Sequence, residues 1–295
     1  MGANPFLEEK FAPKEWHDRL GDTFWKSLHR SAVFLEELDA SLANPESSPC
    51  KGYLSQRRTI PEGLVLISVL DHDDYLYLPL EMSLSAIHRG VTVEQYVGQW
   101  RGNLLDPGKG RLAPGSLGSA AFQIVPEVGK GSERLEHGIG IAMAMRMRGH
   151  AKIVVLPILA RELHSTSVQQ LLRMVAKNQA PIAFLVVDGD AEEVAIACGM
   201  RSADCSSGDT LGTLKLLKNQ MDRIRSRKEP ALIYFSERQG EMRDLSEVLQ
   251  EVLDRKGWIA DSGIREQVRG EIAYGIERAR MIPLPPKNTV IQDVR

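Results

Sequence analysis

The segments KIVVLPIL (152–159), SVQQLLRMVAKN (167–178) and IAFLVV (182–187) decide the fold of this chain. The first and the third are short apolar runs rich in β-branched residues, which is typical of strands buried on both faces. In the middle segment, apolar residues recur at helical spacing on one face: Val168, Leu171, Leu172 and Val175. Strand, helix and strand in this order predict a βαβ unit with parallel strands and a right-handed crossover.

The same alternation continues along the rest of the chain. Further strands are predicted at 64–70, 200–205 and 231–235. Further helices are predicted at 22–42, 82–88, 93–100, 135–148, 192–198, 209–227, 245–256 and 264–280. Together these elements predict an α/β fold of three layers, in which a mainly parallel sheet is flanked by helices.

Composition and charge exclude two classes of protein. The 295 residues carry a net charge of −2, with 43% hydrophobic and 26% charged residues. A nucleic-acid-binding domain usually has a basic surface and a high pI, whereas the pI here is about 6.4. The apolar runs at 64–70, 153–160 and 180–187 are far shorter than the roughly 20 residues that span a bilayer. Neither a nucleic-acid partner nor a membrane is therefore expected.

Residues 19–282 are predicted to form one domain. An irregular arm precedes it at 1–18, and a proline-rich tail follows at 283–295. The three cysteines form no CxxC pair and are sparse, which is typical of reduced thiols: Cys50, Cys198 and Cys205. The first residues show no apolar core of a secretion signal, so a cytoplasmic location is expected.

Ligands of parallel sheets bind outside the carboxyl ends of the strands, and acidic residues follow two of the predicted strands. Asp188 and Asp190 flank Gly189 and are candidates for binding a cofactor or a displaced metal. The alternative is an ordinary turn in which Asp190 caps the next helix. The segment 71–74 (DHDD) is a candidate metal cluster, with a solvated turn as the more common interpretation.

Two further residues are candidates for chemistry. His137 lies on the helix predicted at 135–148 and is a candidate catalytic base, although a packed or interface histidine is the commoner case. Ser165 lies at the start of the helix at 167–178, where backbone N–H groups favour anions such as a phosphate, so it is a candidate for cofactor binding. The alternative for Ser165 is a plain helix cap. No zinc-binding spacing or phosphate-binding loop motif occurs, so the motifs predict no metal site.

Several collinear strings resemble a known family. They are DDYLY (73–77) with IHRGVTVE (87–94), LEHGIGIAMAMRMRG (135–149), GDTL (208–211) with EPALI (229–233), and LPP (284–286). In this order they resemble the alpha subunit of thiamine-diphosphate-dependent 2-oxoacid dehydrogenases, the decarboxylating component. The resemblance implies that residues 19–282 form a thiamine-diphosphate-binding fold.

The chain departs from the family where the cofactor binds. The family has Gly-Asp-Gly after one strand and Asn after the next, which hold magnesium and the cofactor diphosphate. Here these positions read LPILA (156–160) and VDGD (187–190). The family's Tyr-Arg and nearby His are replaced by LPLEM (78–82), and the loop with a cofactor-facing His is shortened at 236–243. Magnesium needs oxygen ligands, so these losses remove several parts of the pocket that binds magnesium and the diphosphate.

The resemblance and its departures together suggest a function. The chain is expected to be an alpha-type subunit without its own thiamine diphosphate site, a pseudoenzyme that acts as a structural or regulatory partner. Its expected partners are a second copy or a beta-type dehydrogenase subunit. The alternative is an active thiamine-dependent 2-oxoacid dehydrogenase subunit that binds thiamine diphosphate and Mg²⁺ together with a beta subunit. A small-ligand-binding protein on a reused fold is a third class.

Overall fold

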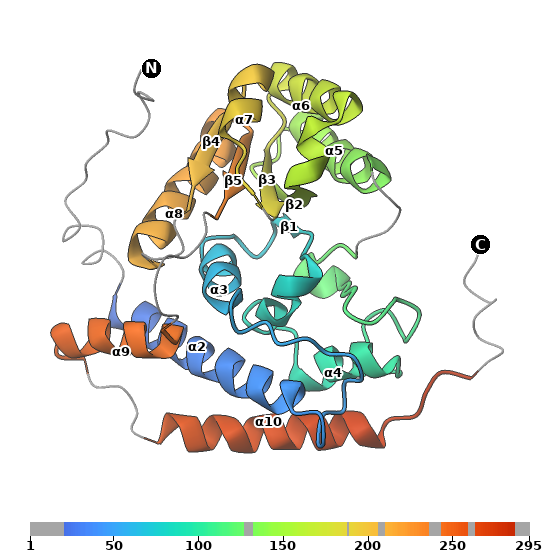
Figure 1. The fold of residues 1–295 in the computed structure, drawn as a ribbon, viewed down its shortest axis with the longest axis vertical. Coiled ribbons are helices and arrows are strands. Elements are labelled where there is room, and N and C mark those ends of the chain that lie inside the picture. The colour runs from blue at the N-terminus through green and yellow to red at the C-terminus, as the bar shows by residue number, and fades with distance from the viewer. Residues whose placement is uncertain are drawn as a thin grey trace.

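The computed structural model describes residues 21–126, 132–187, 189–205, 210–235, 243–258 and 263–286. Within these residues, one sheet has the strand order β1-β2-β3-β5-β4, and every neighbouring pair is parallel (Figure 1). The strands are β1 (Tyr75–Leu76), β2 (Val154–Leu159), β3 (Ile182–Val187), β4 (Arg201–Asp204) and β5 (Ala231–Tyr234). The predicted α/β class with a parallel sheet is confirmed.

Helices cover both faces of the sheet. One face carries α3 (Ile60–Ser68) and α8 (Thr210–Arg227), and the other carries α5 (Ser132–Met147), α6 (Thr166–Asn178) and α7 (Glu192–Cys198). Successive residues of a strand point to opposite faces, so Leu185 joins the first core and Phe184 the second. This alternation makes the three layers that the sequence predicts.

A further layer of helices packs beyond α3. It contains α2 (Asp22–Ala43), α4 (Val93–Arg101), α9 (Leu245–Arg255) and α10 (Ile264–Met281), with short 3₁₀ segments at η1 (Leu80–Ile87), η2 (Ala120–Phe122) and η3 (Ala160–His164). Figure 1 shows α10 running along α2 and α4 at the side of the molecule farthest from α6. Thr92 and Gln95 form the capping box that begins α4, as their spacing predicts.

The prediction of a strand at 64–70 is wrong, because Ile60–Ser68 forms the helix α3. Leu64, Val65, Leu66 and Ile67 are all buried, since α3 lies between the layer of α8 and that of α2. A helix that is buried on all sides has no polar face, and its sequence then reads like a central strand. Pro61 stands in the first turn of the helix, where a missing N–H costs nothing.

Pro157 lies in the middle of β2, a strand with a neighbour on each side, where proline is unusual. The Tyr77 N–H donates to the carbonyl of Val155 at 2.9 Å, so Val155 faces β1. Pro157 is two residues further on and faces the same side. Since β1 pairs with β2 only at Val154 and Val155, the sheet loses no hydrogen bond at Pro157.

The termini fall largely outside the described part of the chain. The arm predicted at 1–18 lies outside the described residues, and so does residue 287 onward of the predicted tail. Residues 283–286 are irregular, as the sequence predicts. Among the described residues, no helix is long and apolar enough to cross a membrane.

Candidate functional site

The carboxyl edge of the sheet is where the sequence places a ligand, and the end of β2 there is closed by α5. Leu156 and Ile158 are fully buried. A Cβ atom on Gly138 would lie 2.8 Å from Cδ2 of Leu156, so the α5 backbone rests directly on the strand. The two side chains fill the space beneath α5 and leave no oxygen ligand on this part of the strand.

His137 lies at the same edge and is held by Tyr77, which follows β1. The fully buried Tyr77 places its hydroxyl 2.8 Å from Nδ1 of His137, and the two rings meet edge to face with centroids 6.1 Å apart. Burial raises the pKa of Tyr77 to about 12, so this phenol is protonated at neutral pH. When it donates to Nδ1, the neutral imidazole carries its proton on Nε2, on an exposed side chain.

An ion pair between Arg134 and Glu162 links α5 to the segment that follows β2. Glu162, in η3, accepts the N–H of Leu159 at 2.9 Å and a guanidinium N–H of Arg134 at 2.8 Å. Both side chains are mostly buried, at 15% and 19% exposure. A bidentate cation is what a diphosphate would require here, but the Arg134 guanidinium already faces a carboxylate.

The ends of β3, β4 and β5 carry negative charge. Burial, together with the nearby carboxylates of Asp204, Glu192 and Asp190, raises the pKa of Tyr234 to about 12. A Cβ atom on Gly189 would lie 2.6 Å from the Cβ of Ala160, so the loop after β3 passes close to the end of β2. Asp190 is exposed beside this close approach, whereas Asp188 lies outside the described residues.

Ser165 stands at the N-cap position of α6, in extended conformation. Its hydroxyl lies 2.9 Å from that of Ser167 and does not cap the helix. Ser165, His137 and Asp190 all lie on the carboxyl side of the strands, but no hydrogen bond or ion pair joins any two of these three within the described chain.

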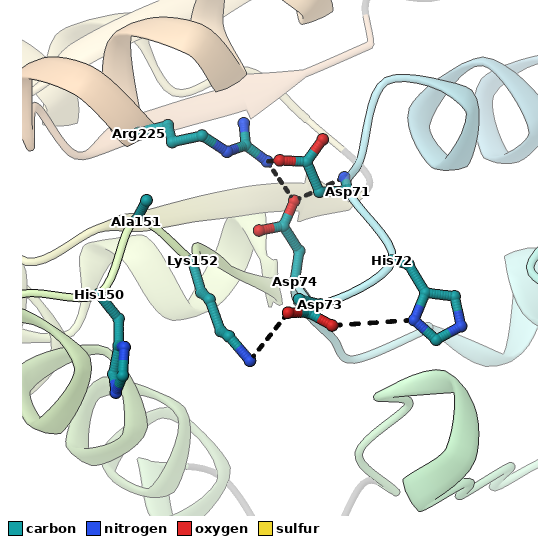
Figure 2. A pocket seen from close by; sticks show the side chains of 8 residues that line it. All are labelled: Asp71, His72, Asp73, Asp74, His150, Ala151, Lys152 and Arg225. Atoms are coloured by element: carbon teal, nitrogen blue, oxygen red, sulfur yellow. Dashed lines mark hydrogen bonds and ion pairs between the residues drawn. The ribbon is translucent and has the colours of Figure 1, made fainter.

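The acidic turn 71–74 lies at the opposite edge of the sheet from the one predicted. The expectation took it to follow a strand, but it precedes β1 and therefore lies at the amino ends of the strands. It lines a shallow pocket of about 320 Å³ together with His150, Lys152 and Arg225 (Figure 2). A ligand site at the carboxyl edge cannot include it.

The charges of this amino-edge pocket are largely paired with one another. Asp74 is 1% exposed, accepts the N–H of Ile153 at 2.9 Å, and also faces Arg225. Burial raises the pKa of Asp74, while the Ile153 N–H and Arg225 oppose that shift. Arg225 also meets Asp71 at 2.9 Å, and Lys152 meets Asp73 at 3.3 Å (Figure 2).

The Arg89 side chain also holds this turn, by hydrogen bonds to the backbone of residues 71–74. Its guanidinium donates to the carbonyl oxygens of Asp71, His72 and Asp74. Among the described residues, no group of three or more His, Cys, Asp or Glu side chains is placed to hold a metal ion. The geometry therefore favours a structural turn over the metal cluster.

Sequence reasoning found His137 but missed its hydrogen-bond partner Tyr77, and it missed three other residues at this edge of the sheet: Arg134, Glu162 and Tyr234. Two local signals were present. Arg134 precedes His137 by about one helical turn, and Glu162 follows the end of β2 by three residues. The contact of Tyr77 with His137 joins residues 60 positions apart, so only the pairing of β1 with β2 reveals it.

Comparisons with known proteins give a distant structural similarity and no match to a family. No family model matches the chain, and no curated protein matches it. Among solved structures, the chain is similar to a "putative thiamin diphosphate-dependent enzyme isolated from Mycobacterium smegmatis", with 19% sequence identity and a TM-score of 0.35. The match covers 60% of this chain and 31% of the other protein's chain, so it spans less than a third of the length of that protein.

The donor set at the carboxyl edge does not fit magnesium diphosphate in the described residues. The end of β2 offers the buried carbon side chains of Leu156 and Ile158, and the nearby cation and carboxylate are Arg134 and Glu162, which pair with each other. Magnesium needs several oxygen ligands in near-octahedral geometry. His137, whose ring contacts Tyr77, is the side chain at this edge whose type suits proton transfer.

Proposed function

We propose that this chain is an alpha-type subunit that resembles those of 2-oxoacid dehydrogenases and acts as a structural or regulatory partner, without a thiamine diphosphate site of its own. One observation carries the proposal. Leu156 lies directly beneath α5, and Ile158 is buried in the same core, at the place where the resemblance puts the first magnesium ligand. A carboxylate there would have to enter the core that α5 and β2 share.

The expected loss of affinity is large. A hydrogen bond to a charged group contributes about 1.5–3 kcal/mol, and each 1.4 kcal/mol changes a dissociation constant tenfold. Losing two or three such contacts therefore weakens binding by several orders of magnitude. The carboxylates of Asp190, Glu192 and Asp204 at the neighbouring strand ends add unfavourable charge toward a diphosphate.

The partner role rests on what the fold retains. The sheet and its flanking helices form two packed apolar cores, one on each face of the sheet. The side of α5 that faces away from the sheet is exposed along most of its length, at Glu136, Gly140 and Ala144 among others. Such a surface is available to a second protein chain.

Calorimetric titration of the full chain with thiamine diphosphate, in the presence and absence of Mg²⁺, tests this proposal. We expect no saturable binding below about 100 μM, because the contacts above are missing. The same titration with a co-expressed beta-type subunit shows whether a partner completes the site. Binding near 1 μM by the chain alone, lost in Asp188→Ala or Asp190→Ala but kept in the exposed control Asp222→Ala, would overturn the proposal.

The second candidate is an active thiamine-dependent dehydrogenase subunit that works with a beta subunit. The Tyr77–His137 pair favours it, since a histidine on an exposed helix face with one ring nitrogen held by a hydrogen bond is suited to proton transfer. Decarboxylation of a 2-oxoacid by the co-purified pair, lost in His137→Gln, would support this candidate over the first.

A further inference from the structure

The outward face of α5 has a charge order that is complementary to itself. Seven residues of this face and of the turn that ends it are exposed: Glu133, Glu136, His137, Gly140, Ala144, Met147 and Arg148. Met147 is 85% exposed, the largest exposed fraction among the large hydrophobic residues described. Acidic residues stand at the N-terminal end, small residues in the middle, and Met147 with Arg148 at the C-terminal end.

We propose that α5 of a second copy of this chain docks antiparallel on this face, across a twofold axis that passes between Gly140 and Ala144. The proposal rests on the proposed function, because it names the partner that the exposed face receives. An antiparallel partner centred there sets Glu136 against Arg148, and the symmetry repeats this pair on the other side. It also sets Gly140 against Ala144 in the middle of the contact.

Charge is the observation that selects a second copy as the occupant. Within the described residues, neither Glu136 nor Arg148 forms an ion pair. A twofold contact is self-complementary, so each of these side chains meets its opposite. The antiparallel arrangement also opposes the two helix dipoles, which is the favourable orientation.

The middle of the face allows a close approach of the two backbones. No described heavy atom other than those of its own helix and its chain neighbours lies within 4 Å of a Cβ built on Gly140, so this position is open on the outside. The inner side of the same helix is occupied by its contacts with the sheet, through Leu135, Ile139 and Ala142. The outward face is therefore free to receive a partner without disturbing the fold.

The size of the contact sets its strength. At 1.5 Å per residue, the 16 residues of α5 extend about 24 Å. A single pair of helices of this length buries less than the roughly 1,200 Å² of a stable interface. We therefore expect a dimer with a dissociation constant in the micromolar range, visible only at high concentration.

Sedimentation velocity of the full chain between about 5 and 300 μM tests the pairing. Glu136→Arg and Arg148→Glu should each weaken the dimer at least tenfold, because each replaces two attractive pairs by two repulsive ones. The double variant Glu136→Arg/Arg148→Glu should return to within about threefold of the original. Gly140→Leu should abolish association, whereas Gly270→Leu, at an open position on α10, should leave it unchanged.

The results that would contradict the twofold pairing can be told apart from a failure of the proposed function. A monomer at 300 μM, a dimer indifferent to Gly140→Leu, or a double charge reversal that fails to restore association each overturns the twofold pairing. Loss of a co-expressed beta-type subunit in these variants, without loss of self-association, also overturns it. Thiamine diphosphate titration reports on the proposed function separately, and circular dichroism confirms that each variant is folded.

Discussion

At the scale of single residues, Asp39 is the most heavily used buried carboxylate in the helical layer. It is 2% exposed and accepts hydrogen bonds from Tyr53 Oη at 2.7 Å, Ser55 Oγ at 2.6 Å and the Gln56 N–H at 2.7 Å. It thereby fixes the loop between α2 and α3.

Replacing Asp39 by alanine leaves buried donors without an acceptor, and such a group costs about 1–3 kcal/mol. We expect Asp39→Ala to lower the free energy of unfolding by about 2–4 kcal/mol in urea titrations. The control is Asp222→Ala, which removes an exposed pair with Lys218 and should cost less than about 1 kcal/mol. Equal losses in the two variants would contradict this account of Asp39.

His88 makes the stability depend on pH. Its Nδ1 lies 2.9 Å from the hydroxyl of Ser31, and burial lowers its pKa to about 4. The unfolded chain has the ordinary histidine pKa of about 6.5 and binds the proton first. A lowered pKa in the folded state gives a contribution that is present above pH 6.5 and is lost as the pH falls toward 4.

His88→Gln should therefore flatten the stability profile between pH 7 and pH 5. The wild-type chain should lose on the order of 2 kcal/mol more than this variant over that range, measured by denaturant unfolding at each pH. His72→Gln is the matched control, because His72 is 67% exposed and should leave the slope unchanged. A wild-type slope that His88→Gln does not reduce would contradict the assignment.

At the scale of elements, α3 depends on a glycine where it packs against η1. A Cβ atom on Gly63 would lie 2.1 Å from the Oγ and 3.0 Å from the Cβ of Ser85. Ser85 is buried, so its hydroxyl cannot move into solvent.

Gly63→Ala should destabilise the protein by about 1–3 kcal/mol, even though alanine favours a helix over glycine by about 1 kcal/mol. The double variant Gly63→Ala/Ser85→Gly should recover most of the loss in thermal unfolding. Gly270→Ala, where a Cβ meets open space on α10, should be neutral or stabilising. If Gly63→Ala instead stabilised the protein, α3 and η1 would have to pack less closely than the distances to Ser85 indicate.

Elements were predictable where their surroundings are ordinary. β3 and α7 have the bounds that their apolar patterns indicate, because one is buried on both faces and the other has an exposed side. α3 was mistaken for a strand, since burial on all sides erases the helical pattern. β1 has two residues, which are too few to show any period, and no pattern along the chain predicted it.

At the scale of the whole molecule, the parallel sheet and its layers follow from the order of the elements, whereas the candidate site does not. The misassigned strand at 64–70 put the turn 71–74 at the wrong edge of the sheet, although its residues were correctly seen as charged. His137 was identified from its type alone. Its partner Tyr77 follows from the neighbouring positions of β1 and β2, which periodicity does not encode.

The junction at Asp74 also bears on how the chain folds. Its hydrogen bonds to Ile153 and Arg225 join residues 79 and 151 positions apart along the chain. Closing loops of this length costs chain entropy before any contact offsets it, and contacts of high sequence separation slow folding. Helices such as α6 can form from local interactions alone. This edge of the sheet forms only after three segments that are distant in sequence come together, so we expect this step to limit the rate of folding.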